Sequence, residues 1–139
     1  MDTNVLVRLL TADDPKQHAQ ARAWFAHRRI VLPVTVLLET EWVLRAAYGY
    51  SQSAIHDAFT RILETPHIQV TDRDAVLRAL PAYALGCDWA DALHAALLPP
   101  ATQECITFDR AFLRHAQKHP DSFPVPIRAA STTPRTPPP

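Results

Sequence analysis

Apolar residues recur at helical spacing along most of this chain, and short β-prone runs separate the helical stretches. The spacing predicts helices over residues 5–10, 15–28, 34–47, 51–64, 72–84, 89–98 and 111–117. The β-prone runs are Ile30–Leu32, Ile68–Val70 and Cys105–Thr107, and Val125–Ile127 is a candidate edge strand, where prolines are tolerated. Strands that alternate with helices favour an α/β fold, in which helices cover both faces of a parallel sheet.

Turn and capping residues predict where several of these helices begin and end. Pro15 follows two aspartates and suits the first position of a helix. Gly49 is placed to end the helix that begins at Val34. Ser51 and Ser53 can cap the helix over 51–64, and Asp72 is placed to cap the helix that follows it.

The composition is that of one soluble globular domain. The chain has 139 residues, of which 47% are hydrophobic and 20% charged, which is enough for a single hydrophobic core. The sequence shows no signal peptide and no run of about 20 apolar residues, so we expect a cytoplasmic protein without a membrane span. We expect the domain to cover residues 1–130 and the proline-rich residues 131–139 to form a disordered tail.

Net charge and glycine content limit the classes of function that this chain can have. The net charge is zero, whereas a nucleic-acid-binding protein usually has a basic excess. A net charge of zero still allows nucleic-acid binding, because acids gathered at one site would leave an excess of arginines elsewhere on the surface. The two glycines cannot build the phosphate-binding loops of P-loop nucleotidases or of dinucleotide-binding dehydrogenases. Cys87 and Cys105 are not in a C-x-x-C arrangement, and we expect both to be reduced thiols.

Four acidic residues carry the candidate chemistry: Asp2, Glu39, Asp91 and Asp109. Each also has an ordinary interpretation. Asp2 and Asp109 can cap the helices that follow them, and Asp91 can be an exposed acid behind the capping residue Asp88. Several carboxylates near one core are costly unless a cation pairs with them, so the set taken together suggests a metal site.

The positions of the acids along the chain support a shared site. Asp88 and Asp91 lie three residues apart, on one side of a predicted helix, where two carboxylates repel each other. Asp109 follows a predicted strand, and the sites of parallel α/β proteins lie beyond the carboxyl ends of the strands. Glu39 shares a side of its helix with apolar neighbours, whereas we expect Glu41 to be solvated.

Four motifs follow one another in the chain. They are Asp2-Thr3-Asn4-Val5-Leu6-Val7-Arg8, Val36-Leu37-Leu38-Glu39 with Trp42-Val43-Leu44, Ala90-Asp91-Ala92-Leu93-His94 and Thr107-Phe108-Asp109-Arg110. In this order and spacing they resemble the PIN domain family, and more narrowly the VapC-type toxins of bacterial type II toxin–antitoxin systems. The resemblance extends over roughly Met1 to Ile127.

The resemblance implies a three-layer α/β/α PIN-like fold with a short central parallel sheet, and a ribonuclease that uses Mg²⁺ or Mn²⁺. It implies the catalytic acids Asp2, Glu39, Asp91 and Asp109, with Asp2, Asp91 and Asp109 as metal ligands. Asn4, Asp88 and Thr107 would support these acids from the same pocket. The substrate would be tRNA or other structured RNA, the partner a VapB-like antitoxin, and the assembly a homodimer.

The start of the chain departs from the family pattern. Family members carry an apolar strand before the first aspartate, whereas only Met1 precedes Asp2 here. We therefore expect the sheet to lack this central strand, through a start assigned too late or through truncation. Asp2 would then be poorly anchored, which leaves a catalytically weak or inactive PIN-fold binding module as the alternative function. A helical regulatory protein without a site is a third interpretation.

Overall fold

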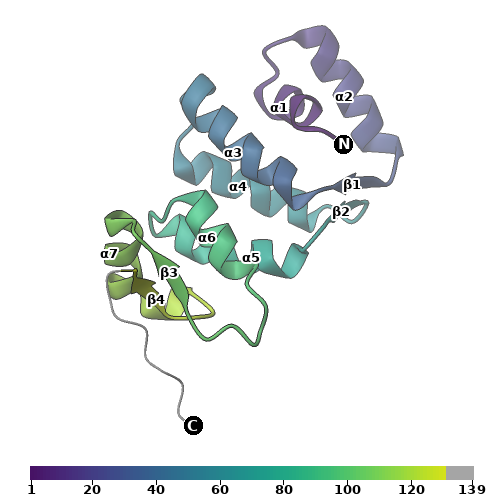
Figure 1. Cartoon of the computed structure of the whole chain (residues 1–139). Coiled ribbons are helices and arrows are strands. Elements are labelled where there is room, and N and C mark those ends of the chain that lie inside the picture. The colour runs from purple at the N-terminus through teal and green to yellow at the C-terminus, as the bar shows by residue number, and fades with distance from the viewer. Residues whose placement is uncertain (131–139) are drawn as a thin grey trace.

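The computed structural model describes residues 1–130, and helices and short strands alternate along them (Figure 1). The helices are α1 (Thr3–Thr11), α2 (Pro15–His27), α3 (Val34–Tyr48), α4 (Gln52–Glu64), α5 (Arg73–Ala84), α6 (Trp89–Ala96), α7 (Arg110–Lys118) and the 3-10 helix η1 (Pro120–Ser122). The strands are β1 (Ile30–Leu32), β2 (Ile68–Val70), β3 (Cys105–Thr107) and β4 (Ile127–Ala129). Within residues 1–130, none of the helices combines the length and the apolar character needed to cross a membrane. The predicted tail, 131–139, lies outside the described residues.

The predicted α/β class with short parallel strands is confirmed. The first three strands lie where the β-prone runs predicted them, and the fourth begins at Ile127 rather than at Val125. Pro124 and Pro126 have no N–H group to donate to a ladder. The nitrogen of Cys105 donates to the carbonyl of Pro126 (2.9 Å), and the β3–β4 ladder runs on from that point.

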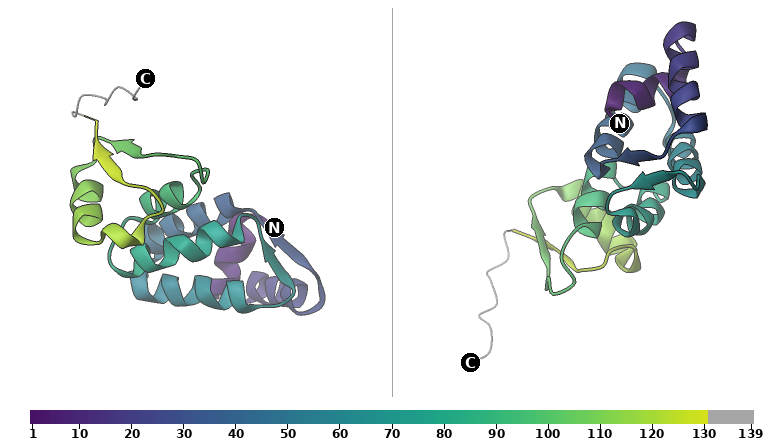
Figure 2. Two further views of the ribbon diagram at one scale, coloured as in Figure 1. Left: turned by 90° about the horizontal axis from the view of Figure 1, so that it is seen from below. Right: turned by 90° about the vertical axis from the view of Figure 1, so that its right-hand side faces the viewer.

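The strands form two separate parallel pairs, as expected of a parallel sheet without its central strand. β1 pairs with β2, with Ile30 opposite Ile68, and β3 pairs with β4, with Cys105 opposite Ile127. Figures 1 and 2 show the two pairs on opposite sides of the central helices. Among residues 1–130, no strand joins β1 to β3, so the predicted central sheet is divided in two.

The core lies among helices α3 to α6. Trp89 of α6 is fully buried and packs against Phe59 of α4 and Tyr83 of α5, with ring centroids 5.3 and 5.2 Å apart. Leu37 of α3 is fully buried in the same core. Burial of each such side chain contributes roughly 1.5–3 kcal/mol. This packing fixes the start of α6, which Asp88 immediately precedes.

The helix ends at Gly49 and Ser51 agree with the prediction, and the one at Asp72 does not. Ser51 caps α4, since its hydroxyl accepts from the nitrogen of Ala54 (3.2 Å). Gly49 ends α3 in the left-handed region, with φ at 66°. The predicted side-chain cap at Asp72 is wrong, because its side chain makes no capping hydrogen bond. Its backbone is left-handed, with φ at 51°, and its carbonyl accepts from the nitrogen of Ala75 (2.8 Å) instead.

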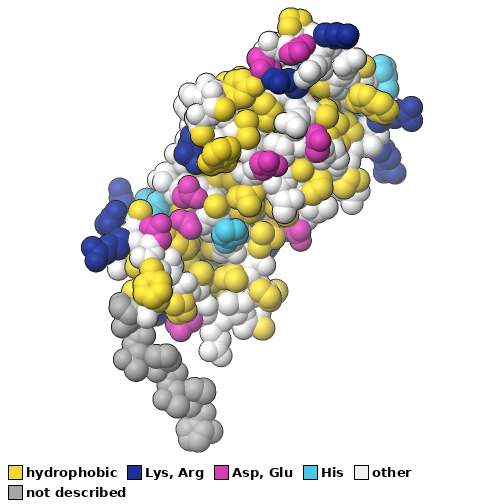
Figure 3. Space-filling view, turned by 45° about the horizontal axis from the view of Figure 1, so that its top comes forward, with side chains coloured by type: hydrophobic (Ala, Val, Ile, Leu, Met, Phe, Trp, Pro, Cys, Tyr) yellow, Lys and Arg dark blue, Asp and Glu magenta, His cyan; other side chains and the backbone are white. Residues whose placement is uncertain are grey.

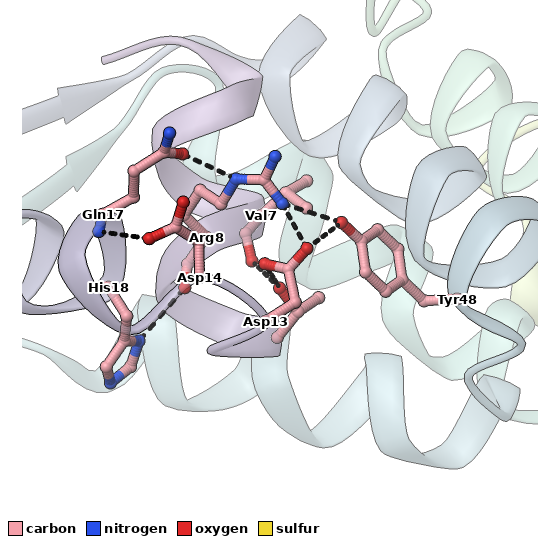
Figure 4. A network of polar contacts seen from close by, with 8 residues as sticks. Val7, Arg8, Asp13, Asp14, Gln17, His18 and Tyr48 are labelled. Atoms are coloured by element: carbon pink, nitrogen blue, oxygen red, sulfur yellow. Dashed lines mark hydrogen bonds and ion pairs between the residues drawn. The ribbon is translucent and has the colours of Figure 1, made fainter.

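Arg8 of α1 connects the N-terminal helices to α3 (Figure 4). Its guanidinium donates to Asp13, to the Oε1 of Gln17 (2.8 Å) and to the hydroxyl of Tyr48 (3.0 Å), which itself donates to Asp13 (2.8 Å). The hydrogen bond from Arg8, followed by that from Tyr48, holds the pKa of the Asp13 carboxyl well below its usual range. The network therefore anchors α1, the helix that Asp2 precedes.

Candidate active site

Three acids of the predicted site line one cavity of about 500 Å³: Asp88, Asp91 and Asp109. Asp88 precedes α6, and Asp109 precedes α7 a short distance after β3. Both carboxylates also cap their helices. The Oδ1 of Asp88 accepts from the nitrogen of Ala90 (2.9 Å), and the Oδ1 of Asp109 accepts from that of Ala111 (2.6 Å). The capping interpretation and the site interpretation therefore apply to the same residues.

The carboxylates in this cavity repel one another. Asp91 is half-buried, and the pKa of its carboxyl is raised, first by burial and then by the negative charges of Asp88 and Asp109. Crowded like charges favour the protonated acid, or a cation that offsets them. The electrostatics of the cavity thus favour a positively charged ligand.

A second cavity, of about 370 Å³, adjoins the first through Asp88, which lines both. Glu39 and Trp42 of α3 also line it, and the Trp42 side chain is 61% exposed. Figure 3 shows acidic side chains spread over one face of the molecule, between hydrophobic ones. Glu39 thus lies beside the cavity of the three aspartates, although it does not line that cavity.

The two glutamates of α3 differ in environment: Glu39 lies beside apolar residues, as we predicted, whereas Glu41 is not solvated. Glu39 is exposed and accepts a hydrogen bond from the hydroxyl of Thr3. Glu41, which we expected to be solvated, is only 4% exposed. It accepts from the Nε of Arg45 (2.9 Å) and from the hydroxyl of Tyr83 (3.1 Å). The prediction was wrong because Glu41 lies on the side of α3 that packs into the core, where these two donors satisfy its carboxylate.

Of the remaining predicted residues, Thr107 contacts the site, whereas Asp2 and Asn4 do not line its cavity. Asp2 is exposed and caps α1, since its Oδ1 accepts from the nitrogen of Val5 (3.2 Å), and it lines neither acidic cavity. Asn4 lines a separate hollow beside α2. Thr107 supports the site directly, because its hydroxyl accepts from the nitrogen of Asp109 (3.0 Å).

The chemistry of the acidic cavity suits a hard divalent cation, since carboxylate oxygens are the ligands that Mg²⁺ and Mn²⁺ prefer. Asp91 and Asp109, two of the three predicted metal ligands, line this cavity together. The structure does not bring Asp2, the third, to it. Among residues 1–130, no three acidic, histidine or cysteine side chains lie close enough to hold a metal ion as they stand.

Two further residues of the acidic cavity, His115 and Cys87, were not predicted. The Nε2 of His115 is buried and has no hydrogen-bond partner among the described residues. Burial, then the charges of His119 and Lys118, lowers the pKa of His115. No motif in the sequence pointed to His115, which lies one helical turn after Ala111, another residue that lines the cavity.

Gln52 of α4 fixes the loop that leads into the site. Its Nε2 donates to the carbonyls of Tyr83 (2.6 Å) and Cys87 (3.1 Å), one at each end of the turn between α5 and α6. Asp88 follows directly after Cys87. The position of the Asp88 carboxylate therefore depends on a side chain from a different helix.

A known protein family matches most of this chain. The sequence profile of the PIN domain matches residues 1–118, a range that contains all the predicted site residues. No curated protein and no solved structure matches the chain. Because the matched range covers most of the 139 residues, the chain belongs to the PIN domain family, whose members are generally nucleases.

Proposed function

We propose that this protein is a Mg²⁺- or Mn²⁺-dependent endoribonuclease toxin of the VapC type, which hydrolyses phosphodiester bonds in tRNA or other structured RNA. The observation that carries the proposal is the meeting of Asp88, Asp91 and Asp109 at one cavity, where burial and then the charges of Asp88 and Asp109 raise the pKa of Asp91. Such an arrangement is stabilised by a bound cation, and PIN domains typically use divalent metals.

The acids divide the work of hydrolysis among them. Asp91 and Asp109, together with Asp2, would hold the cation, and Glu39 or Asp109 would orient and deprotonate the attacking water. A bound Mg²⁺ or Mn²⁺ would lower the pKa of that water and would offset the negative charge of the phosphate. The role of Asp2 requires its carboxylate to approach the cavity, since in this structure it caps α1. Thr107 keeps Asp109 in place through its hydrogen bond.

Water is the nucleophile that the surroundings of the site favour. Burial, followed by the charges of Asp91 and Asp88, raises the pKa of the Cys87 thiol to about 12. Burial also raises the pKa of Cys105. Both thiols therefore stay protonated near neutral pH, and a protonated thiol is a poor nucleophile. This supports in-line attack by water without a covalent intermediate.

Cleavage of RNA tests the proposal. The purified protein should cut tRNA in the presence of Mg²⁺ or Mn²⁺, and EDTA or the substitution Asp91→Asn should abolish the cut. Asp57→Asn is the matched control, because Asp57 is an exposed acid of α4 beside His56. Cleavage that persists in EDTA and in Asp91→Asn would overturn the proposal.

If the protein is a toxin, its partners are a VapB-like antitoxin and a second copy of the chain. The four sequence motifs support this role. Expression in bacteria should arrest growth, and Asp91→Asn should not. Co-expression with the small protein encoded beside the gene should restore growth, and light scattering should show a homodimer. An active nuclease whose expression leaves growth unchanged would contradict the toxin role.

The alternative function is a PIN-fold binding module with weak or no catalysis. The observation that favours it is the position of Asp2, which caps α1 and does not line the acidic cavity. Calorimetric titration with Mn²⁺ separates the two functions. Binding that disappears in Asp91→Asn supports the nuclease, whereas no binding at millimolar Mn²⁺ supports the module.

A further inference from the structure

Phe108 is the most exposed of the large apolar side chains that the structure describes, at 84%. It lies between Thr107, at the end of β3, and Asp109, at the start of α7. An exposed aromatic ring forgoes the free energy that burial would provide. Its neighbour Asp109 lines the acidic cavity, so Phe108 adjoins a residue of the proposed active site along the chain.

Hydrogen bonds on both sides of Phe108 hold the backbone in place. The hydroxyl of Thr107 accepts from the nitrogen of Asp109 (3.0 Å), and the carbonyl of Thr107 accepts from the nitrogen of Ala130 (2.9 Å). The Oδ1 of Asp109 accepts from the nitrogen of Phe112 (2.9 Å). Because the segment is already ordered, a ligand that contacts the Phe108 ring loses little conformational entropy of the protein on binding.

Helix α7 continues from this point with one basic side. Arg110, Arg114 and Lys118 lie four residues apart, so they share a side of the helix with a rise of about 6 Å between neighbours. All three are exposed, and among residues 1–130 none of them forms an ion pair. Phe112 and Ala116 are the buried residues of the same helix. The cations are therefore available to a ligand.

An exposed aromatic ring followed by a row of cations matches the chemistry of one nucleic-acid strand. Bases stack on aromatic rings whatever their sequence, and cations spaced along a helix contact successive phosphates. An acidic peptide would use the cations but would have no flat base to place on the ring of Phe108. The row begins beside Asp109, so a strand that follows it would pass the acidic cavity.

We propose that Phe108 stacks on a base of the RNA beside the bond that is cut, and that Arg110, Arg114 and Lys118 bind the phosphates that follow. This inference rests on the proposed ribonuclease function and adds to it the residues that position the substrate. Phe108 would then determine which phosphodiester bond lies at the acids. The row of cations along α7 would determine the direction in which the RNA strand runs past them.

Binding of RNA, measured apart from cleavage, tests the inference. The full chain in EDTA is titrated into a fluorescent, unstructured RNA of about 12 nucleotides, and anisotropy is followed at several salt concentrations. Phe108→Ala should weaken binding about tenfold, and Phe108→Trp should restore it, because stacking tolerates any aromatic ring. The triple variant R110Q/R114Q/K118Q should lower the slope of log Kd against log salt by about 2.

Matched variants control for the loss of an exposed ring or of charge. Trp24→Ala removes an exposed aromatic side chain of α2, and K16Q/R22Q/R61Q removes three exposed cations of α2 and α4. Both should bind RNA like the unchanged chain. Binding to a duplex of the same sequence should not depend on Phe108, because its bases are already stacked and paired.

Each of three results would overturn the inference. The first is that Phe108→Ala binds the single-stranded RNA as tightly as Trp24→Ala does, and the second is that the triple variant keeps the full slope of log Kd against log salt. The third is that Phe108→Ala weakens binding to the duplex as much as binding to the single strand. Thermal melting of each variant shows whether it is folded, and Phe108→Trp keeps the test valid if Phe108→Ala is not. A metal-dependent nuclease with any of these results would leave the proposed function standing and remove only the inference. RNA binding with the expected pattern, but without metal-dependent cleavage, would support the RNA-binding role of Phe108 and α7 and overturn the proposed nuclease function.

Discussion

The hydroxyl of Tyr83 donates a hydrogen bond to the Oε1 of Glu41 (3.1 Å), which joins α5 to α3 inside the protein. The same oxygen accepts from the Nε of Arg45 (2.9 Å). Burial, and then the charge of Glu41, raises the pKa of Tyr83, so its hydroxyl remains a donor at neutral pH. The ring of Tyr83 also packs on Trp89, the residue after Asp88. The bond therefore helps to hold the helix start that presents an acid to the site.

Removal of this hydroxyl should destabilise the protein. Tyr83→Phe leaves Arg45 as the one remaining hydrogen-bond donor to the buried Glu41 among the described residues, and the free energy of unfolding in urea should fall by about 1–3 kcal/mol. Tyr50→Phe is the control, because its hydroxyl makes only a long contact, 3.4 Å, to a carbonyl of α1. Equal losses in the two variants would contradict a special role for the Glu41–Tyr83 bond.

Gln52→Ala should affect the site as well as stability. The two carbonyls that Gln52 holds, those of Tyr83 and Cys87, lie in and beside the turn before Asp88. We expect a loss of about 1–3 kcal/mol in unfolding free energy, since two hydrogen bonds are removed. Cleavage of RNA should also slow at temperatures where the variant is fully folded. Gln20→Ala, at an exposed position of α2, should change neither quantity.

The elements that the sequence predicted well are those set by neighbouring residues. The β-branched runs Ile30–Leu32 and Ile68–Val70 became strands with the predicted ends, and Ser51 caps α4 as expected. Asp88 and Asp109 also cap their helices. These outcomes depend on residues one to four positions apart, which a single sequence contains.

The outcomes that were missed depend on residues far apart in the chain. Glu41 is buried because Tyr83, 42 positions away, supplies a donor. Asp2 caps α1 and does not line the cavity of Asp91 and Asp109, so its role as a third metal ligand stays a prediction. His115 enters the cavity through the packing of α7, not through any motif. Spacing along a helix shows which residues share a side, but not what that side meets.

Cation binding should be visible as a change in thermal stability. In EDTA, Asp91→Asn should melt above the unchanged chain, because the substitution removes one of the crowded charges of Asp88, Asp91 and Asp109. Mg²⁺ should then stabilise the unchanged chain, by about 1.4 kcal/mol at ten times its Kd, and leave Asp91→Asn unchanged. Calorimetric scans measure both effects, and an equal rise with Mg²⁺ in the two proteins would contradict a cation at this cavity.

The Arg8–Asp13 pair predicts a pH-dependent contribution to stability. The pKa of Asp13 is lowered in the folded protein, so the folded state binds fewer protons than the unfolded chain in the acidic range. The stabilisation is therefore complete above the unfolded value of about 3.9 and is lost as the pH falls through the folded value. Asp13→Asn should lower Tm at pH 7, and the difference should shrink in acid and in high salt. Asp121→Asn, at an exposed acid of η1, should show no such trend.

Trp89 allows the contribution of core packing to be separated from that of its indole N–H. The side chain is fully buried against Phe59 and Tyr83, yet its Nε1 has no hydrogen-bond partner among residues 1–130. Trp89→Ala should cost about 3–5 kcal/mol, because a large cavity opens in the core. Trp89→Phe keeps a ring and removes a donor that is already unsatisfied, so it should cost clearly less. Urea unfolding followed by far-ultraviolet circular dichroism measures both, and a Phe variant as unstable as the Ala variant would show that the indole N–H is bonded in solution.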